Sequence, residues 1–246
     1  MPTTPVAVIT GAGSGIGRAA AFTLARAGHN LVLIGRRAEA LEETAALLAG
    51  STESISLPAD IADPSSARSI VSAALGRFGR LDTVVNNAAM APLKPIEEHS
   101  PALLQQTFFT NTVGPACLIS AAWTVFKKQH AEGNLAPLGH CVVNVSTLGT
   151  KDPFPGFFAY AASKAGLNLM ARSCAKEGAA CRVRAFAVAP GAVETPMLRA
   201  LFTPELLPPS HCLTPERVAE EILACIAGER DHLNGQTIFL TADNAL

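Results

Sequence analysis

Near its start the chain reads Val6-Ala7-Val8-Ile9-Thr10-Gly11-Ala12-Gly13-Ser14-Gly15-Ile16-Gly17. The first four residues are all apolar, which is typical of a strand buried on both faces of a parallel sheet. The glycines that follow allow a tight turn and a close approach of the backbone to a ligand. A helix expected over residues 18–27 would direct its free amides and positive dipole end toward a phosphate. A glycine-rich loop alone can be an ordinary turn, but between a buried strand and a helix it favours phosphate binding.

The same alternation of short apolar runs with helix-forming segments continues to the end of the chain. Further strands are expected at residues 31–34, 54–58, 81–85, 140–145, 183–189 and 236–240. Strands that alternate with helices imply right-handed crossovers and a parallel sheet. The sequence therefore predicts an α/β fold, a Rossmann-type doubly wound parallel sheet in three layers, with one domain over residues 1–246.

Chemically distinctive residues lie just past the expected strand ends. Ligands bind at the carboxyl ends of the strands in such sheets, so these residues should meet in one crevice. They are Gly11, Arg36, Asp60, Asn87, Ser146, Thr147, Pro190 and Gly191.

Tyr160 is the only tyrosine of the chain, and Lys164 follows it by four residues in a segment that favours helix. Positions i and i+4 lie on one face of a helix, so the phenol and the ammonium should be side by side. A free tyrosine has a pKa of about 10. An adjacent positive charge would lower that pKa and allow general acid/base work near neutral pH. The alternative is that the tyrosine merely packs.

Gly35 stands where an acidic residue would hold the ribose hydroxyls of NAD, and Arg36 and Arg37 follow it. Guanidinium groups suit a 2′-phosphate, so the sequence favours NADP(H) over NAD(H). The alternative is that the two arginines cap or solvate the next helix.

Two helical regions carry further signals. Asp63 is expected to be the N-cap of a helix with Pro64 in its first turn. A long helix is expected over residues 101–129, with Asn111 and Gly114 inside it. Asparagine and glycine are locally unfavourable there, and such conflicts are often functional.

Composition excludes several classes of protein. The formal net charge of −1 gives no indication of nucleic acid or an acidic membrane as a partner. No apolar run of about 18 residues predicts a membrane span, and no signal peptide is visible before the first strand. The six cysteines have neither Cys-x-x-Cys nor zinc-type spacing, so no metal site is expected. We interpret them as small buried hydrophobes in a reducing cytoplasm.

Taken together, these motifs resemble the short-chain dehydrogenase/reductase family in its single-domain form, over nearly the whole chain. The resemblance rests on Thr10-Gly11-x-x-x-Gly15-x-Gly17, Asn86-Asn87-Ala88-Ala89, Asn111, Tyr160-x-x-x-Lys164 and Pro190-Gly191. It implies an oxidoreductase that uses a nicotinamide cofactor to interconvert a carbonyl and a secondary alcohol.

The resemblance also implies residue roles. The residues implied at the pyrophosphate are Gly11, Ser14, Gly15, Ile16 and Gly17. Asp60 and Ile61 are implied at the adenine, Asn87 and Ala88 at the nearby ribose, Lys164 at the nicotinamide ribose, and Val193 and Thr195 at the carboxamide. Tyr160, Pro190 and Gly191 are also implied to contact the cofactor. Lys164 would lower the pKa of Tyr160, which would exchange a proton with the substrate oxygen. Asn111 would hold a water that links Lys164 to solvent. Alternatives remain: Asp60 as a turn cap, Asn111 as a packing irregularity, and Thr195 as an N-cap.

The chain departs from the family pattern at three places. The usual serine pair is Ser146-Thr147; the family's spacing to Tyr160 slightly favours Thr147 as the substrate-holding hydroxyl, and Ser146 stays open. Ala89 replaces a common glycine. The end of the last strand reads Thr241-Ala242-Asp243-Asn244 instead of the family's usual Asp-Gly-Gly, in a region that in the family often borders the pocket or a subunit contact.

An apolar substrate wall is expected from Phe154, Phe157, Phe158, Leu198, Leu201 and Phe202, although these residues could equally pack on the scaffold. The expected partners are a small carbonyl or alcohol substrate and, by resemblance only, further copies in a homodimer or homotetramer. Two alternatives remain for the function: a 3-oxoacyl-thioester reductase of fatty-acid type, which would need a basic surface, and a non-catalytic cofactor-sensing module.

Overall fold

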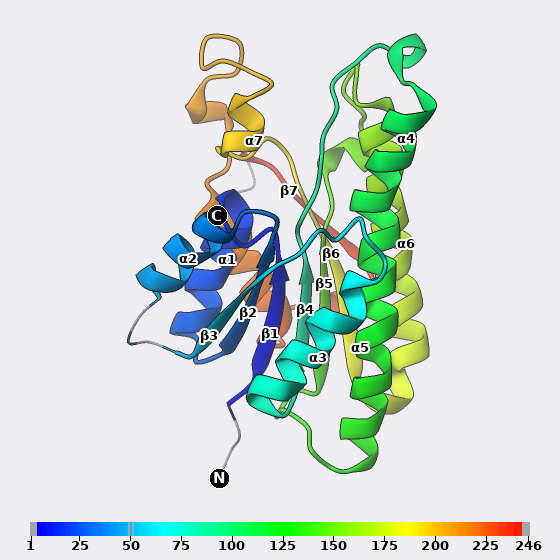
Figure 1. Cartoon of the computed structure of the whole chain (residues 1–246). Coiled ribbons are helices and arrows are strands. Elements are labelled where there is room, and N and C mark those ends of the chain that lie inside the picture. The colour runs from blue at the N-terminus through cyan, green and yellow to red at the C-terminus, as the bar shows by residue number, and fades with distance from the viewer. Residues whose placement is uncertain (1–3, 49, 51, 243–246) are drawn as a thin grey trace.

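A parallel sheet runs through the middle of the molecule in the order β3-β2-β1-β4-β5-β6-β7 (Figure 1). This computed structural model describes residues 4–48, 50 and 52–242. The strands are β1 (Val6–Thr10), β2 (Asn30–Gly35), β3 (Ser54–Pro58), β4 (Thr83–Asn86), β5 (His140–Val145), β6 (Val183–Pro190) and β7 (Thr237–Leu240). The reversal of strand order beside β1 is that of a doubly wound sheet, so the predicted Rossmann-type fold is confirmed.

Helices cover both faces of the sheet and make the outer two layers (Figure 1). They are α1 (Gly15–Arg26), α2 (Ala38–Leu47), α3 (Ser66–Phe78), α4 (Pro101–Phe108), α5 (Gly114–Ala131), α6 (Phe158–Gly178), α7 (Pro196–Arg199) and α8 (Pro215–Ile226). Helices α1 and α8 share one hydrophobic core with the sheet, and α3, α5 and α6 share the other. Within the described part of the chain, no helix combines the length and apolar character that crossing a membrane requires.

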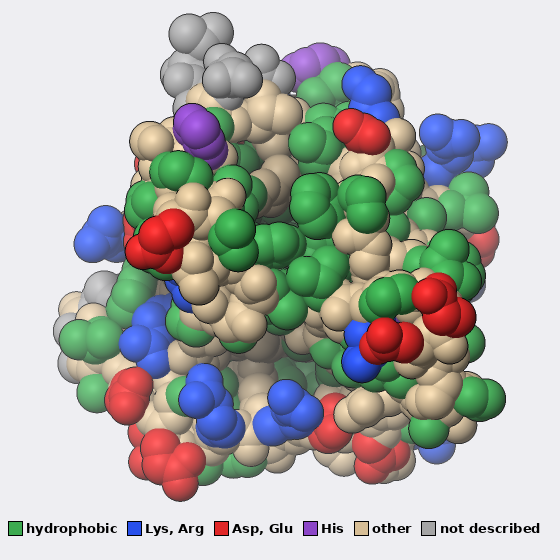
Figure 2. Space-filling view, turned by 90° about the horizontal axis from the view of Figure 1, so that it is seen from above, with side chains coloured by type: hydrophobic (Ala, Val, Ile, Leu, Met, Phe, Trp, Pro, Cys, Tyr) green, Lys and Arg blue, Asp and Glu red, His purple; other side chains and the backbone are tan. Residues whose placement is uncertain are grey.

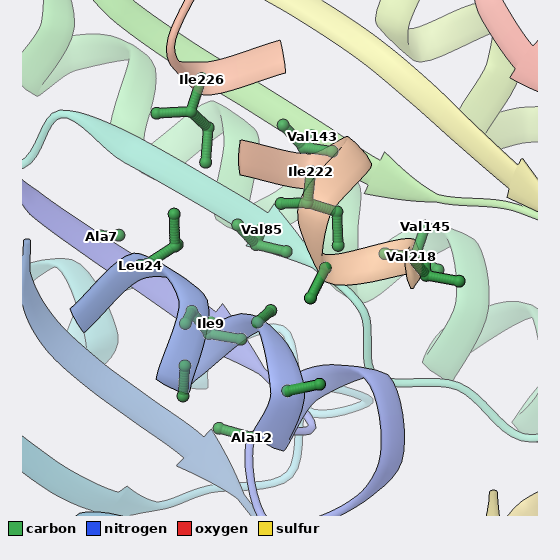
Figure 3. Close-up of a cluster of buried hydrophobic side chains, with 14 of the residues drawn as sticks. Ala7, Ile9, Ala12, Leu24, Val85, Val143, Val145, Val218, Ile222 and Ile226 are labelled. Atoms are coloured by element: carbon green, nitrogen blue, oxygen red, sulfur yellow. The ribbon is translucent and has the colours of Figure 1, made fainter. Parts of the chain in front are cut away.

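The all-apolar composition of β1 follows from these two cores. Ala7 and Ile9 point into the core under α1 and α8, while Val6 and Val8 point into the opposite one. Figure 3 shows the first core, where Ile9 lies among side chains from α1 and α8. Because β1 is a central strand with both faces buried, the glycine loop that follows it is held in a fixed place at the carboxyl end of the sheet.

Several predicted element boundaries differ from the structure, among them the start of helix α1 at Gly15 instead of residue 18, and two of the differences follow from side-chain hydrogen bonds. Strand β4 begins at Thr83, not residue 81, because the Gln129 amide takes the place of a neighbouring strand at Leu81. Its Oε1 accepts from Leu81 N at 2.9 Å and its Nε2 donates to Leu81 O at 3.1 Å. Helix α3 begins at Ser66, because the Asp63 carboxylate closes a turn by accepting from both the amide and the hydroxyl of Ser65.

The predicted long helix over residues 101–129 is three pieces. A π-helical turn, Phe109–Val113, separates α4 from α5, and Gly114 N–H donates to the carbonyl of Phe109, five residues back. A Cβ at Gly114 would lie 2.1 Å from the Ile61 carbonyl oxygen. The glycine is therefore explained by close packing against the loop after β3. Asp243 and Asn244, part of the third sequence departure, lie outside the described residues.

Candidate active site

A cleft with a volume of about 930 Å³ opens at the carboxyl ends of the strands. Figure 2 looks down on this end, where hydrophobic side chains surround a central hollow. The structure brings to this cleft all the residues assigned to the site from the sequence, except Gly17 and Asn111. Those two lie behind its wall: Gly17 is packed under the glycine loop and Asn111 is fully buried.

The glycine loop is compact and leaves the start of α1 open. Gly11 and Gly15 have positive φ angles of 69° and 50°, which favour glycine. A Cβ at Gly17 would lie only 2.1 Å from the Gly11 carbonyl oxygen. Ser14 makes no side-chain hydrogen bond to the first turn of α1, whereas Ser100 and Thr214 do cap their helices. The first amides of α1 are thus left for a ligand, which fits a pyrophosphate.

Asn87 holds the glycine loop in place. Its Nδ2 donates to Thr10 O at 2.8 Å and to Gly11 O at 3.3 Å. In return, the Thr10 hydroxyl accepts from the amides of Asn87 at 2.9 Å and Ala88 at 3.0 Å. Thr10 belongs to the glycine-rich sequence motif, but its role is visible only in the structure. Its hydroxyl joins the ends of β1 and β4 and so sets the shape of the loop.

Arg18 also holds the glycine loop in place, a role that was not predicted from the sequence. Its Nη2 donates to Gly13 O at 2.7 Å, and its Nε donates to the Thr44 hydroxyl at 3.1 Å. The same guanidinium pairs with Glu43 at 3.0 Å. A basic residue at the fourth position of a helix gives no signal in the sequence that it turns back onto the preceding loop.

Arg36 and Arg37 follow β2 and are both exposed at the cleft. Arg37 occupies the N-cap position of α2, but its side chain does not cap the helix. Across the described residues, neither guanidinium has a hydrogen-bond or ion-pair partner, so both remain available to an anion. Asp60 does cap a turn, since its Oδ1 accepts from Ala62 N at 2.9 Å, and it also lines the cleft with Ile61.

Tyr160 and Lys164 lie one turn apart on α6, as predicted. Lys164 is 1% exposed, and its Nζ donates to Val145 O at 2.6 Å. The Tyr160 hydroxyl interacts with the Thr147 side chain. Burial raises the pKa of Tyr160 to about 12, although the interaction with Thr147 opposes the rise, and burial lowers the pKa of Lys164 to about 7. The expected lowering of the phenol pKa is therefore wrong for the chain by itself, because burial of the hydroxyl dominates.

The two neighbouring hydroxyls point to different places. Ser146 is buried, and its Oγ donates to the carbonyl of Lys164 at 3.3 Å. Thr147 is half-buried and lines the cleft, where its Oγ1 also accepts from Gly149 N at 3.2 Å. Of the two side chains, Thr147 is the one that interacts with the phenol.

Asn111 lies in the π-helical turn, and its side chain forms hydrogen bonds with the chain after β4. Its Nδ2 donates to Met90 O at 2.8 Å and to the Ser163 hydroxyl at 2.9 Å, while its Oδ1 accepts from Met90 N at 2.9 Å. Both amide hydrogens are therefore engaged within the protein. This side chain ties the loop after β4 to α6, the helix that carries Tyr160.

The loop after β6 closes the cleft opposite the glycine loop. Gly191 N donates to Leu240 O at 2.8 Å, and Val193 is buried. The Thr195 hydroxyl accepts from Leu198 N at 3.2 Å and caps α7, as one alternative predicted. A Cβ at Gly15 would lie 3.0 Å from the Thr195 methyl group, so the two loops nearly touch.

Aromatic side chains form much of the remaining wall. Phe154, Phe157 and Phe202 line the cleft with Leu198 and Leu201, as predicted.

Phe158, predicted for the same wall, does not line the cleft. It is 49% exposed and packs edge-on against His99 at 5.7 Å between ring centroids. It is the first residue of α6, so its side chain leaves the helix in a different direction from that of its neighbour Phe157.

The comparisons with known proteins agree with this geometry. The family model for short chain dehydrogenases matches residues 5–206. A short chain dehydrogenase/reductase (astE) of Aspergillus oryzae is 32% identical over 95% of this chain and 92% of its own. Levodione reductase of Leifsonia aquatica is 30% identical over 98% of this chain and 88% of its own. A 3-ketoacyl-(acyl-carrier-protein) reductase from Brucella melitensis, complexed with NADH, superimposes with a TM-score of 0.89 at 25% identity, covering all of both chains.

The fold and the cleft together define an oxidoreductase that uses a nicotinamide dinucleotide. The chain belongs to the short-chain dehydrogenase/reductase family and is a dehydrogenase/reductase acting on CH–OH and C=O groups. Members of this family act on small-molecule substrates.

Proposed function

We propose that the chain is an NADP(H)-dependent oxidoreductase that interconverts a carbonyl compound and a secondary alcohol, with Tyr160 as the general acid/base. The observation that carries the proposal is that Thr147, Tyr160 and Lys164 line one cleft, with buried Lys164 one helical turn from Tyr160 on α6. When bound, the nicotinamide supplies or accepts the hydride. The protein's part is to orient the reactants and move one proton.

The residues at the cleft suit each part of a dinucleotide. The open amides at the start of α1, with Gly11, Ser14, Gly15 and Ile16, would hold the pyrophosphate, and Gly17 permits the turn. Asp60 and Ile61 would border the adenine, and the Asn87-Ala88 turn the adjoining ribose. Pro190, Gly191, Val193 and Thr195 would border the carboxamide.

The proton would pass between Tyr160 and the substrate oxygen. In reduction Tyr160 donates its proton to that oxygen, and the Thr147 hydroxyl donates a hydrogen bond to the same oxygen. Lys164 in its charged form stabilises the resulting phenolate. The Asn111 side chain has used both amide hydrogens, so a water linking Lys164 to solvent would be held by its main chain.

Arg36 and Arg37 support NADP(H) as the preferred cofactor. Both guanidiniums are exposed at the end of β2 and lack a partner among the described residues, as a 2′-phosphate site requires. The similar reductase from Brucella melitensis is complexed with NADH, so NADH is the alternative cofactor to compare. The ratio of kcat/KM for NADPH to that for NADH tests it, and a preference for NADH would overturn the assignment.

Reduction of a 3-oxoacyl thioester is the second candidate, favoured by the similarity to the 3-ketoacyl-(acyl-carrier-protein) reductase. It needs a basic surface for an acidic carrier, and the net charge of −1 does not favour one. NADPH oxidation with a panel of ketones, aldehydes and an acetoacetyl thioester separates the two. Turnover confined to the thioester would replace the first proposal.

Assembly into a homodimer or homotetramer stays part of the proposal. Apolar side chains on α4 and α6 support it, since Phe108 is 37% and Leu169 62% exposed. The molar mass in solution, measured by light scattering, tests this point.

A further inference from the structure

One guanidinium organises the loop between β6 and α8 that forms the top of the cleft (residues 194–213, the lid; Figure 1). Arg199 Nε donates to Glu194 Oε1 at 2.6 Å, and its Nη2 donates to the other oxygen of the same carboxylate. Its Nη1 donates to Leu207 O at 2.9 Å and to Phe202 O at 3.3 Å. Arg199 therefore ties the beginning of the lid to its middle.

This arrangement depends on the shape of the guanidinium. A planar fork can pair with both oxygens of a carboxylate and still direct another N–H to backbone carbonyls, whereas an ammonium acts as a point charge. The hydrogen bonds from Arg199 lower the pKa of Glu194, so the pair stays charged at neutral pH. The geometry, not the charge alone, holds the Phe202 and Leu207 carbonyls.

Fixing the Phe202 backbone places its ring against the wall of the cleft. The Phe202 ring meets Phe154 edge-on at 5.8 Å and Phe157 at 6.3 Å between centroids. Phe157 in turn lies 5.2 Å from the ring of Tyr160. A continuous aromatic contact thus runs from the lid to the phenol, and Arg199 sets its outer end.

The charges around this wall are unevenly distributed. Among the described residues that line the cleft, the basic ones are Arg36 and Arg37, after β2, and Lys164, which donates to a backbone carbonyl. Asp152 is the acidic residue on the aromatic side of the cleft. Arg199, a cation behind these rings, is already paired with Glu194, so an anionic group beside the rings would meet the Asp152 carboxylate without a free cation among the described residues that line this side of the cleft.

We propose that Arg199 is a positioning residue that shapes an aromatic-walled subsite, and that this subsite takes uncharged carbonyl compounds whose carbonyl is flanked by a ring or a bulky hydrocarbon group. The inference rests on the proposed function, since it concerns the substrate of the same site. It adds a chemical class of substrate and a residue that acts through the lid without touching the reacting atoms.

A matched pair of ketones tests the substrate class. The probes are 4-methylcyclohexanone and 4-oxocyclohexanecarboxylate, which share a ring and differ in one methyl or carboxylate group. The wild-type enzyme should reduce the methyl compound with kcat/KM at least about tenfold higher, because an unpaired carboxylate in an apolar subsite is costly. Equal rates, or a preference for the carboxylate, would overturn the proposal.

The variants Arg199→Met and Arg199→Lys test the positioning role. Both should raise KM for 4-methylcyclohexanone by about five- to tenfold while changing kcat much less, since lysine cannot reproduce the fork. Phe202→Ala should also raise KM for 4-methylcyclohexanone. Arg68→Met, on the exposed face of α3, is the control and should leave both constants unchanged. Rescue by Arg199→Lys would mean that charge alone suffices and would contradict the geometric argument.

A binding measurement tests the role of Arg199 independently of catalytic turnover. Tyr160→Phe and Tyr160→Phe/Arg199→Met, saturated with NADPH, are titrated calorimetrically with 4-methylcyclohexanone, and their melting temperatures show whether each is folded. The double variant should bind at least about fivefold more weakly. Tight binding in both variants refutes the role of Arg199. Ketone binding without turnover by the wild type refutes the proposed function and leaves the subsite standing.

Discussion

Lys164 Nζ donates a hydrogen bond of 2.6 Å to the carbonyl oxygen of Val145 from a side chain that is 1% exposed. Val145 is the last residue of β5, and Lys164 lies on α6. The bond therefore fixes the catalytic helix against the end of the central sheet. Its donor is an ammonium whose pKa burial lowers to about 7, so this contact carries a cost in stability that depends on pH.

Replacement of Lys164 by methionine should stabilise the cofactor-free protein at low pH. The pKa falls from 10.5 in the unfolded chain to about 7 in the fold, so between these values the unfolded chain binds more protons. The stability of the wild type should then rise with pH across this window, and the penalty should be constant below about pH 7. Lys164→Met should gain on the order of a few kcal/mol near pH 6.5 and lose that gain toward pH 10.

Urea unfolding of the wild type and Lys164→Met at pH 6.5, 8 and 9.5 measures this difference. Lys127→Met, on the exposed side of α5, is the matched control and should show no pH-dependent gain. A stability difference that is the same at all three pH values would show that the buried ammonium is not the cause. Turnover by Lys164→Met should be lost throughout, because nothing then stabilises the phenolate.

Removal of the Tyr160 hydroxyl should lower kcat without weakening the binding of NADPH. Tyr160→Phe keeps the ring contact with Phe157 but loses the proton that the carbonyl oxygen needs. We expect kcat to fall by about 10²–10⁴-fold, the usual contribution of a general acid. The NADPH dissociation constant, measured by fluorescence titration, should stay within about twofold. Near-normal kcat in this variant would refute the mechanism.

The adjacent hydroxyls of Ser146 and Thr147 should contribute unequally to kcat. Thr147→Val should lower kcat by about 10²-fold, as expected for the loss of one hydrogen-bond donor to a developing oxyanion. Ser146→Ala should leave kcat within a few-fold and cost about 1 kcal/mol of stability, since it removes only the bond to the Lys164 carbonyl. Thr147→Ser, which keeps the hydroxyl, should restore most of the activity. The reverse ranking of Thr147→Val and Ser146→Ala would assign the role to Ser146.

The fold could be predicted from the sequence because its signals are local. The all-apolar run at β1 predicted a strand buried on both faces, and in the structure Ala7 and Ile9 are buried on one face of the sheet and Val6 and Val8 on the other. The start of β4 could not be read in this way. It depends on Gln129, a residue 48 positions away whose amide takes up the backbone groups of Leu81.

The sequence predicted where the site lies in the fold, but not which way its side chains point. Residues just past strand ends were expected at one crevice, and parallel strands bring them there. The sequence cannot show that Ser146 hydrogen-bonds to the backbone carbonyl of Lys164 while Thr147 interacts with the Tyr160 phenol, since both are hydroxyls at adjacent positions. Nor can it show that Arg199 bonds to backbone carbonyls, because every residue has one and the choice depends on the path of the lid.

Removal of the two guanidiniums after β2 should change cofactor choice more than catalysis. Arg36→Ser/Arg37→Ser should lower kcat/KM for NADPH by about 10- to 100-fold, since the two exposed guanidiniums together should contribute about 1.4–2.7 kcal/mol to binding of the 2′-phosphate. The value for NADH should change by less than about threefold, because its ribose presents no phosphate at that place. The NADPH value of the wild type should also fall with added salt, and that of the double variant much less. Arg26→Ser, exposed at the far end of α1, controls for general loss of positive charge. Equal losses for both cofactors would show that the arginines support the protein and not the 2′-phosphate.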